Sequence, residues 1–174
     1  MGKYINFEQL AMFLCTTTLM DSVEKNGIEK VDLIINHPYF DKAKSRLIKS
    51  IFIAVEKGHF EIFKKLIKIK DDDVNIQDSN RNILLNFAVI KKRLEIAEYI
   101  LDYRSFDQKK CDIFAAFTFY IKNVTDESIN MMNKLYKYDK MKTINFHEQL
   151  PTGESFLTLI ASQKFIENNL YNIA

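Results

Sequence analysis

The chain has 174 residues, of which 47% are hydrophobic and 28% are charged, and its net charge is +2. These values are typical of one folded domain or a short repeat array, and they exclude a disordered tail. Four glycines and two prolines are too few for collagen-like or hairpin-rich β architectures, and the small net charge gives little support to a dedicated nucleic-acid-binding protein.

The longest uncharged apolar stretch near the N-terminus covers residues 10–20 and is too short to span a bilayer. A secretory signal is not favoured, because Lys3 is the only basic residue before this stretch, Glu8 also precedes it, and no small-residue cleavage site follows. Cys15 and Cys111 form no CxxC motif. We therefore expect reduced thiols and a cytoplasmic protein.

Three segments of the sequence align with one another without gaps: SVEKNGIEKVDLII at 22–35, AVEKGHFEIFKKLI at 54–67 and AVIKKRLEIAEYIL at 88–101. The offsets between them are 32 and 34 residues. A repeat of this length is typical of ankyrin or tetratricopeptide units and is shorter than a HEAT repeat. The sequence therefore predicts an array of repeats.

A broad apolar stripe at helical spacing recurs in the second and third segments. Its members are Ile62, Phe63, Leu66 and Ile67, and then Ile96, Ala97, Ile100 and Leu101. A shorter apolar helix precedes each stripe and ends near Val55 or Val89. Neither helix of such a pair can bury its apolar residues alone, so neighbouring pairs must cover them. We expect an all-α fold, an α-solenoid of stacked antiparallel helix pairs joined by short turns or hairpins.

After the third segment the pattern weakens. Apolar helices are predicted at 113–122 and 129–136, with an extra stretch at 123–128 between them. The last part begins with GESFLTLIA at 153–161, but its second helix keeps only a sparse apolar stripe. A polar outer face of this kind is typical of a capping repeat at the end of an array.

These residues resemble ankyrin repeats. Gly58-His59 and Glu61-Ile62 stand where the family has G-H-x-E-I, and Asp73-Val74-Asn75 matches its D-V-N linker. Residues 153–161 resemble its G-x-T-P-L-H-x-A-A segment. The resemblance covers most of the chain as one domain of about five units, which we place at 7–38, 39–72, 73–106, 107–143 and 144–174.

The chain departs from the family pattern at its turns. No unit contains T-P-L-H, Arg81 stands at the turn glycine of the third unit, and Lys92 stands where Gly58 stood. Asn80 and Asn82 flank Arg81. Because asparagine tolerates the left-handed backbone conformation, we expect a hairpin-like turn to survive there at some cost in stability.

The acidic run from Asp71 to Asp78 is similar to the start of a calcium-binding loop. An EF-hand loop needs glycine at its sixth position and glutamate at its twelfth, where this chain has Ile76 and Asn82. We therefore interpret the run as a linker between repeats with surplus charge in solvent.

Residues 42–70 hold nine basic side chains and two glutamates. Lys64, Lys65 and Lys68 lie opposite the apolar stripe of their helix, and we interpret them as a solvated outer face. Binding of anionic lipid or RNA through this region is the alternative. The aromatic residues there are expected to be buried rather than free to stack on bases.

The histidines do not form a metal-binding pair, and the sequence has no HExxH motif. We expect structural roles for His37 and His59, whereas His147 lies in a long loop and could have any role. Motifs of nucleophilic, phosphate-binding and dinucleotide-binding enzymes are absent from the sequence. We therefore expect no enzyme activity, and an unrecognised enzyme site near Thr125 to Ser128 is kept as an alternative.

The resemblance implies a protein-interaction module. In the family, turn tips and inner helices form a long concave face that binds another protein. We expect a monomer that binds a protein partner and takes no metal or small-molecule cofactor, and nucleic acid and membrane surfaces are not favoured as partners. Carrying the family's binding positions over to this sequence gives Arg46, Glu56, Lys57, Ser79, Asn80, Asn82, Lys91, Thr152 and Glu154.

Overall fold

The computed structural model describes residues 18–42, 46–122, 126–139 and 158. Helices dominate these ranges, whose β structure is an isolated antiparallel bridge between Gln77 and Ile83. The expected all-α class is confirmed. The chain divides into two compact units, one ending at Phe106 and the other beginning at Asp107, and each is described by itself. In the part of the chain given above, the helices fall short of the length and apolarity that a bilayer crossing requires.

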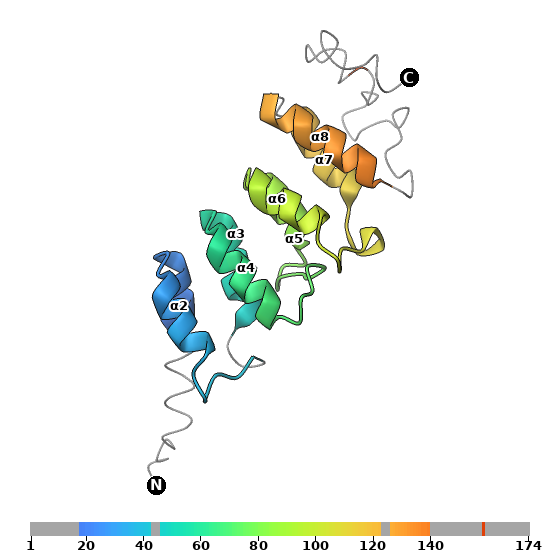
Figure 1. Ribbon diagram of the computed structural model, residues 1–174. Coiled ribbons are helices and arrows are strands. Elements are labelled where there is room, and N and C mark those ends of the chain that lie inside the picture. Colours follow the sequence, from blue (N-terminus) through green and yellow to red (C-terminus); the bar gives the residue numbers. More distant parts are fainter. Residues whose placement is uncertain (1–17, 43–45, 123–125, 140–157, 159–174) are drawn as a thin grey trace. The chain divides into compact units, whose positions relative to one another are not determined.

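The first unit is built from helices that are joined by short turns within a pair and by longer loops between pairs (Figure 1). They are residues 18–24, α2 (Ile28–Ile35), α3 (Leu47–Lys57), α4 (Phe60–Ile69), α5 (Leu84–Ile90) and α6 (Leu94–Leu101). Within pairs, α3 packs on α4 and α5 packs on α6. Between neighbouring pairs, α3 packs on α5 and α2 packs on α4, so this unit is the predicted stack of helix pairs.

The predicted apolar stripes form the core of this stack. All eight stripe residues of α4 and α6 are at most 2% exposed. Ala54, Val55, Leu85 and Ala88 cover them from α3 and α5 and are fully buried. Helices of 7 to 11 residues are not stable alone in water, so burial between neighbours is what keeps them folded.

The turns inside the two helix pairs have the same backbone. Gly58 has a φ of 79° and Lys92 a φ of 56°, both in the left-handed region. The next residue closes the turn in each case, since the N–H groups of His59 and Arg93 donate to the carbonyls of Ala54 and Ala88 at 2.8 Å. Lys92 therefore adopts the glycine conformation despite its Cβ, at a cost of about 1–2 kcal/mol.

The hairpin-like turn of the third unit is present, but its left-handed residue differs from the one expected. Arg81 has a φ of 63°, whereas Asn80 and Asn82 do not have positive φ values. The two asparagines support the turn by hydrogen bonding to Asp78 instead. Our expectation that asparagine would supply the left-handed conformation was wrong. The contacts with Asp78 hold both asparagines, and Arg81 between them adopts the left-handed conformation.

The second unit contains a short 3-10 helix, η1 (Gln108–Lys110), and two helices that pack on one another, α7 (Ile113–Lys122) and α8 (Asp126–Tyr138). The predicted extra stretch at 123–128 is shorter than expected, because α8 already begins at Asp126. Most of the predicted fifth unit, including Thr152 and Glu154, lies outside the described residues.

Candidate functional site

A groove of about 1060 Å³ lies in the first unit, lined by α3 and residues just before it, by the end of α4, by the loop that leads into α5 and by α5 itself. Its apolar lining includes Leu47, Phe52 and Ile53 from α3 and Phe87 from α5. The rings of Phe52 and Phe87 meet edge to face with centroids 5.1 Å apart. Because these helices belong to neighbouring pairs, the stacking of the pairs creates the groove.

Charged side chains surround this apolar lining. Five of them are basic and three are acidic: Lys42, Arg46, Lys49, Lys70 and Lys91, and then Glu56, Asp71 and Asp78. The Nζ of Lys42 lies 3.3 Å from the carboxylate of Asp71, and Lys91 forms an ion pair with Glu56. Several of the charges that line the groove are therefore already matched within the protein.

The pair of Lys91 and Glu56 joins the two walls of the groove. The Nζ of Lys91 donates a hydrogen bond to the Glu56 carboxylate and also lies 5.3 Å from the ring centroid of Phe87. The hydrogen bond from Lys91 lowers the pKa of Glu56, although partial burial acts in the opposite direction. Glu56 therefore stays ionised, and the pair links α3 to the end of α5.

The loop that forms one rim of the groove is organised by Asp78. Its carboxylate accepts hydrogen bonds from the backbone N–H groups of Asn80 and Asn82 at 2.8 and 2.9 Å, and from the side-chain amide of Asn82 at 2.8 Å. Partial burial raises the pKa of Asp78, but these hydrogen bonds outweigh it and the net shift is downward. Ser79 and Asn80 are left exposed at the tip, facing solvent.

The structure brings together most of the site residues predicted from the resemblance. Those that line the groove are Arg46, Glu56, Ser79, Asn80, Asn82 and Lys91. Lys57 is not among the lining residues, because its Nζ lies 3.2 Å from Glu24 of the preceding repeat. Thr152 and Glu154 lie outside the described part of the chain.

Sequence reasoning missed the apolar part of the groove. Ile53 and Phe87 are both half-buried and both line it. They stand immediately before the aligned residues Ala54 and Ala88, so they occupy one repeat position. The sequence did contain a signal for this lining, because a large apolar residue stands directly before the core alanine in both repeats.

Equivalent polar contacts recur between successive repeats and hold them in register. Lys91 pairs with Glu56 just as Lys57 pairs with Glu24, and both pairs join equivalent positions in neighbouring repeats. The guanidinium of Arg93 donates to the backbone carbonyl of Glu56, with Nη2 at 2.6 Å and Nε at 3.1 Å. His59 occupies the equivalent place one repeat earlier, with its Nε2 3.4 Å from the carbonyl of Glu24. The expected structural role of His59 fits this contact.

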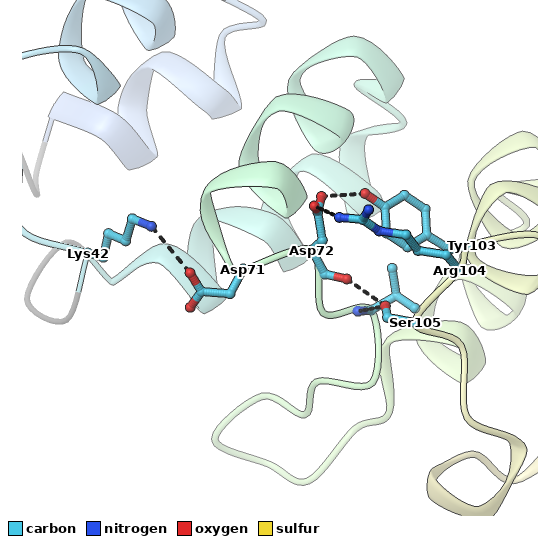
Figure 2. A network of polar contacts seen from close by, with 7 residues as sticks. Lys42, Asp71, Asp72, Tyr103, Arg104 and Ser105 are labelled. Atoms are coloured by element: carbon cyan, nitrogen blue, oxygen red, sulfur yellow. Dashed lines mark hydrogen bonds and ion pairs between the residues drawn. The ribbon is translucent and has the colours of Figure 1, made fainter.

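The acidic run is a joint between repeats rather than surplus charge in solvent (Figure 2). The carboxylate of Asp72 accepts a hydrogen bond from the Tyr103 hydroxyl at 2.5 Å and pairs with Arg104, while its backbone carbonyl accepts from Ser105. On the other side, Asp71 faces Lys42. The linker interpretation therefore fits, but the charges have specific partners.

These contacts also shift the pKa values of Asp72 and Tyr103. The hydrogen bond from Tyr103 lowers the pKa of Asp72, with a further contribution from the charge of Arg104. Burial and the same hydrogen bond raise the pKa of Tyr103. Asp72 thus remains a carboxylate and Tyr103 a neutral donor at neutral pH.

The lysine-rich region is less open than a solvated face would be. Lys65 pairs with Asp32 of the preceding repeat at 2.9 Å. Lys64 pairs with Glu61 at 2.6 Å and lies 4.7 Å from the ring centroid of Phe60. Lys68 is exposed, so only part of this face matches the expected solvated surface.

Comparison with known families decides the identity of the fold. A family model described as ankyrin repeats in three copies matches residues 19–113, which is 95 of the 174 residues. The chain belongs to the ankyrin-repeat family. A search among curated proteins gave no match. Ankyrin repeats generally mediate protein–protein interaction and are typically non-enzymatic, so the family directs attention to the groove as a binding surface.

Proposed function

We propose that this ankyrin-repeat chain is a protein-interaction module that binds a segment of its partner in the groove between α3 and α5. The proposal is carried by the agreement between two independently obtained sets of residues. The positions carried over from the family and the groove found in the structure share Arg46, Glu56, Ser79, Asn80, Asn82 and Lys91.

The chemistry of the groove supports a peptide ligand. The half-buried side chains of Ile53 and Phe87 offer an apolar surface, and the exposed Ser79 and Asn80 offer a hydroxyl and an amide at the rim. An amide both donates and accepts hydrogen bonds, which matches the two polar groups of a peptide bond. A partner segment would thus gain affinity in the apolar part and orientation at the rim.

The other expectations for the whole chain belong to this proposal as well. They are the division into five units as one domain, the monomeric state, the cytoplasmic location and the contribution of Thr152 and Glu154 to binding. The helix pair α7–α8 supports the fourth unit at 107–143.

Affinity capture with one groove variant and one matched control tests the proposal. Asn80→Tyr places a bulky neutral side chain at the rim, and Asn133→Tyr makes the same change at an exposed position of α8. We expect a protein from a source-cell lysate to be retained by the native chain and by Asn133→Tyr. It should bind Asn80→Tyr at least about tenfold more weakly, with unchanged thermal unfolding.

Three results would contradict the proposal. They are retention of the same proteins by both variants, retention of no protein by the native chain, and salt-sensitive binding of RNA or anionic vesicles alone. The last of these would favour the lysine-rich region as a surface for anionic ligands.

A further inference from the structure

In the described part of the chain, some of the charged side chains that line the groove already have a partner within the protein, and others do not. Each of its three acidic residues already accepts hydrogen bonds or an ion pair from the protein itself. Asp71 faces Lys42, Glu56 faces Lys91, and Asp78 binds the backbone of its own loop. Two of these carboxylates are therefore matched by a lysine, and the third, Asp78, directs its oxygens at the N–H groups of its own loop.

Its basic residues are not all matched. Within the ranges that the structure describes, Arg46, Lys49 and Lys70 take part in none of the ion pairs. Arg46 and Lys49 are exposed, and Lys70 is half-buried where α4 ends. Unmatched cations beside a low-dielectric apolar surface create a local positive potential, even though the net charge of the chain is only +2.

The apolar lining limits what kind of anion fits. Phe52 is 6% exposed, and its neighbour Phe87 is half-buried against it. Single-stranded nucleic acids bind through open aromatic faces on which bases stack, whereas Phe52 is almost fully covered and Phe87 packs against it. A side chain of modest size, aliphatic or aromatic, fits beside such rings more readily than a stacked base.

We infer that the partner segment recognised by this groove is acidic and carries an apolar anchor residue. Its carboxylates pair with Arg46, Lys49 and Lys70, and its anchor packs against Ile53 and Phe87, which line the groove and are half-buried. The inference rests on the proposed function and adds the chemistry of the ligand. Charge complementarity carries it, because like-charged segments would be repelled and neutral ones would leave the cations unpaired.

Selection from a phage-displayed library of random linear peptides tests the inference. The library is selected on the native chain, and one enriched peptide is then synthesised and titrated against two double variants. Arg46→Glu/Lys49→Glu reverses charge in the groove, and Lys109→Glu/Lys137→Glu reverses charge at exposed positions of the second unit. Thermal unfolding confirms that both variants are folded.

We expect enriched peptides with an excess of aspartate and glutamate around an aliphatic or aromatic residue. Affinity for the groove variant should fall at least about tenfold, affinity for the control should change little, and native binding should weaken as salt is raised.

The failures are distinguishable. Peptides that lose affinity for Asn80→Tyr but show no acidic excess overturn this inference and leave the proposed function standing. Peptides that bind Asn80→Tyr as well as the native chain, or no enrichment at all, overturn both. Binding of polyuridine RNA or phosphatidylserine vesicles without any enriched peptide also overturns both.

Discussion

Asp71 and Asp72, which follow the end of α4, are two successive left-handed residues with φ values of 58° and 57°. Such a conformation costs a non-glycine residue about 1–2 kcal/mol, so it persists only where surrounding contacts require it. At Asp72, the contacts to Tyr103 and Arg104 supply that requirement, and Asp71 faces Lys42 beside it (Figure 2). At this corner, individual side chains decide where one repeat ends and the next begins.

Asp72→Asn should reduce stability in a pH-dependent way. The folded-state pKa of Asp72 is lowered, so its carboxylate stabilises the fold above the unfolded pKa of about 3.9, and this is lost as pH falls through the folded value. We expect the variant to melt a few degrees below the native chain at about pH 7. The two melting temperatures should converge once the pH lies below the folded-state pKa of Asp72.

Thermal unfolding followed by circular dichroism across this pH range measures the effect. Tyr103→Phe removes the hydroxyl that lowers the pKa of Asp72 and should reproduce part of the loss at neutral pH. A constant difference between Asp72→Asn and the native chain at every pH would show that the charge of Asp72 is not involved.

Lys92→Gly should stabilise the chain. Lys92 is exposed and holds a φ of 56°, so glycine relieves backbone strain without removing a buried contact. After the greater entropy of glycine in the unfolded chain is subtracted, we expect a gain of about 0.5–1 kcal/mol in the free energy of unfolding by urea.

The equivalent turn gives the opposite control. Gly58→Ala adds a Cβ at a φ of 79°, at 3.2 Å from the Arg93 guanidinium, and should lower stability by about 1 kcal/mol. Equal stability of the native chain and Lys92→Gly would mean that the left-handed lysine carries no strain.

At the scale of the element, each helix is a short amphipathic segment whose stability comes from its neighbours. The outer faces are linked by ion pairs such as Lys65 with Asp32, but side chains that are 37% and 40% exposed gain little from pairing. Burial of the stripes is therefore the dominant contribution, and the polar contacts mainly fix the register of the pairs.

Leu85→Ala should destabilise the first unit strongly. Leu85 lies in α5 and is 0% exposed, so truncation removes buried surface and leaves a cavity, at a cost of about 2–5 kcal/mol. Leu33→Ala is the matched control, because Leu33 is 74% exposed on α2 and its loss should cost less than about 0.5 kcal/mol.

Denaturant unfolding of both leucine variants measures the difference. A similar small effect for the two would show that α5 is not packed in solution as it is in this structure. A large effect for Leu33→Ala would instead point to a contact that covers the exposed face of α2.

At the scale of the whole molecule, the chain consists of two compact units, and all residues that line the groove belong to the first. Within the first unit, α3 packs on α5 and α2 packs on α4, so neighbouring helix pairs cover one another as in a repeat array. The net charge of +2 conceals the local excess of cations in the groove. Binding properties therefore follow from how neighbouring repeats are stacked rather than from overall composition.

The sequence by itself determined the helices and their repetition. The spacing of Ile62, Phe63, Leu66 and Ile67 is a local property of a helix with 3.6 residues per turn, so it could be recognised without knowing the neighbours. The alignment of Lys92 with Gly58 was also visible in the sequence, but it was the structure that showed the left-handed backbone at both positions.

Only the tertiary structure decided which charges are available and what lies between the helices. Lys91 meets Glu56 and Lys65 meets Asp32 across more than thirty residues of sequence, and Phe52 meets Phe87 across a similar distance. Lys57 was assigned to the site by the resemblance, yet it points to Glu24. Such contacts depend on the stagger between stacked pairs, and that stagger is set by how the side chains of the two pairs pack together.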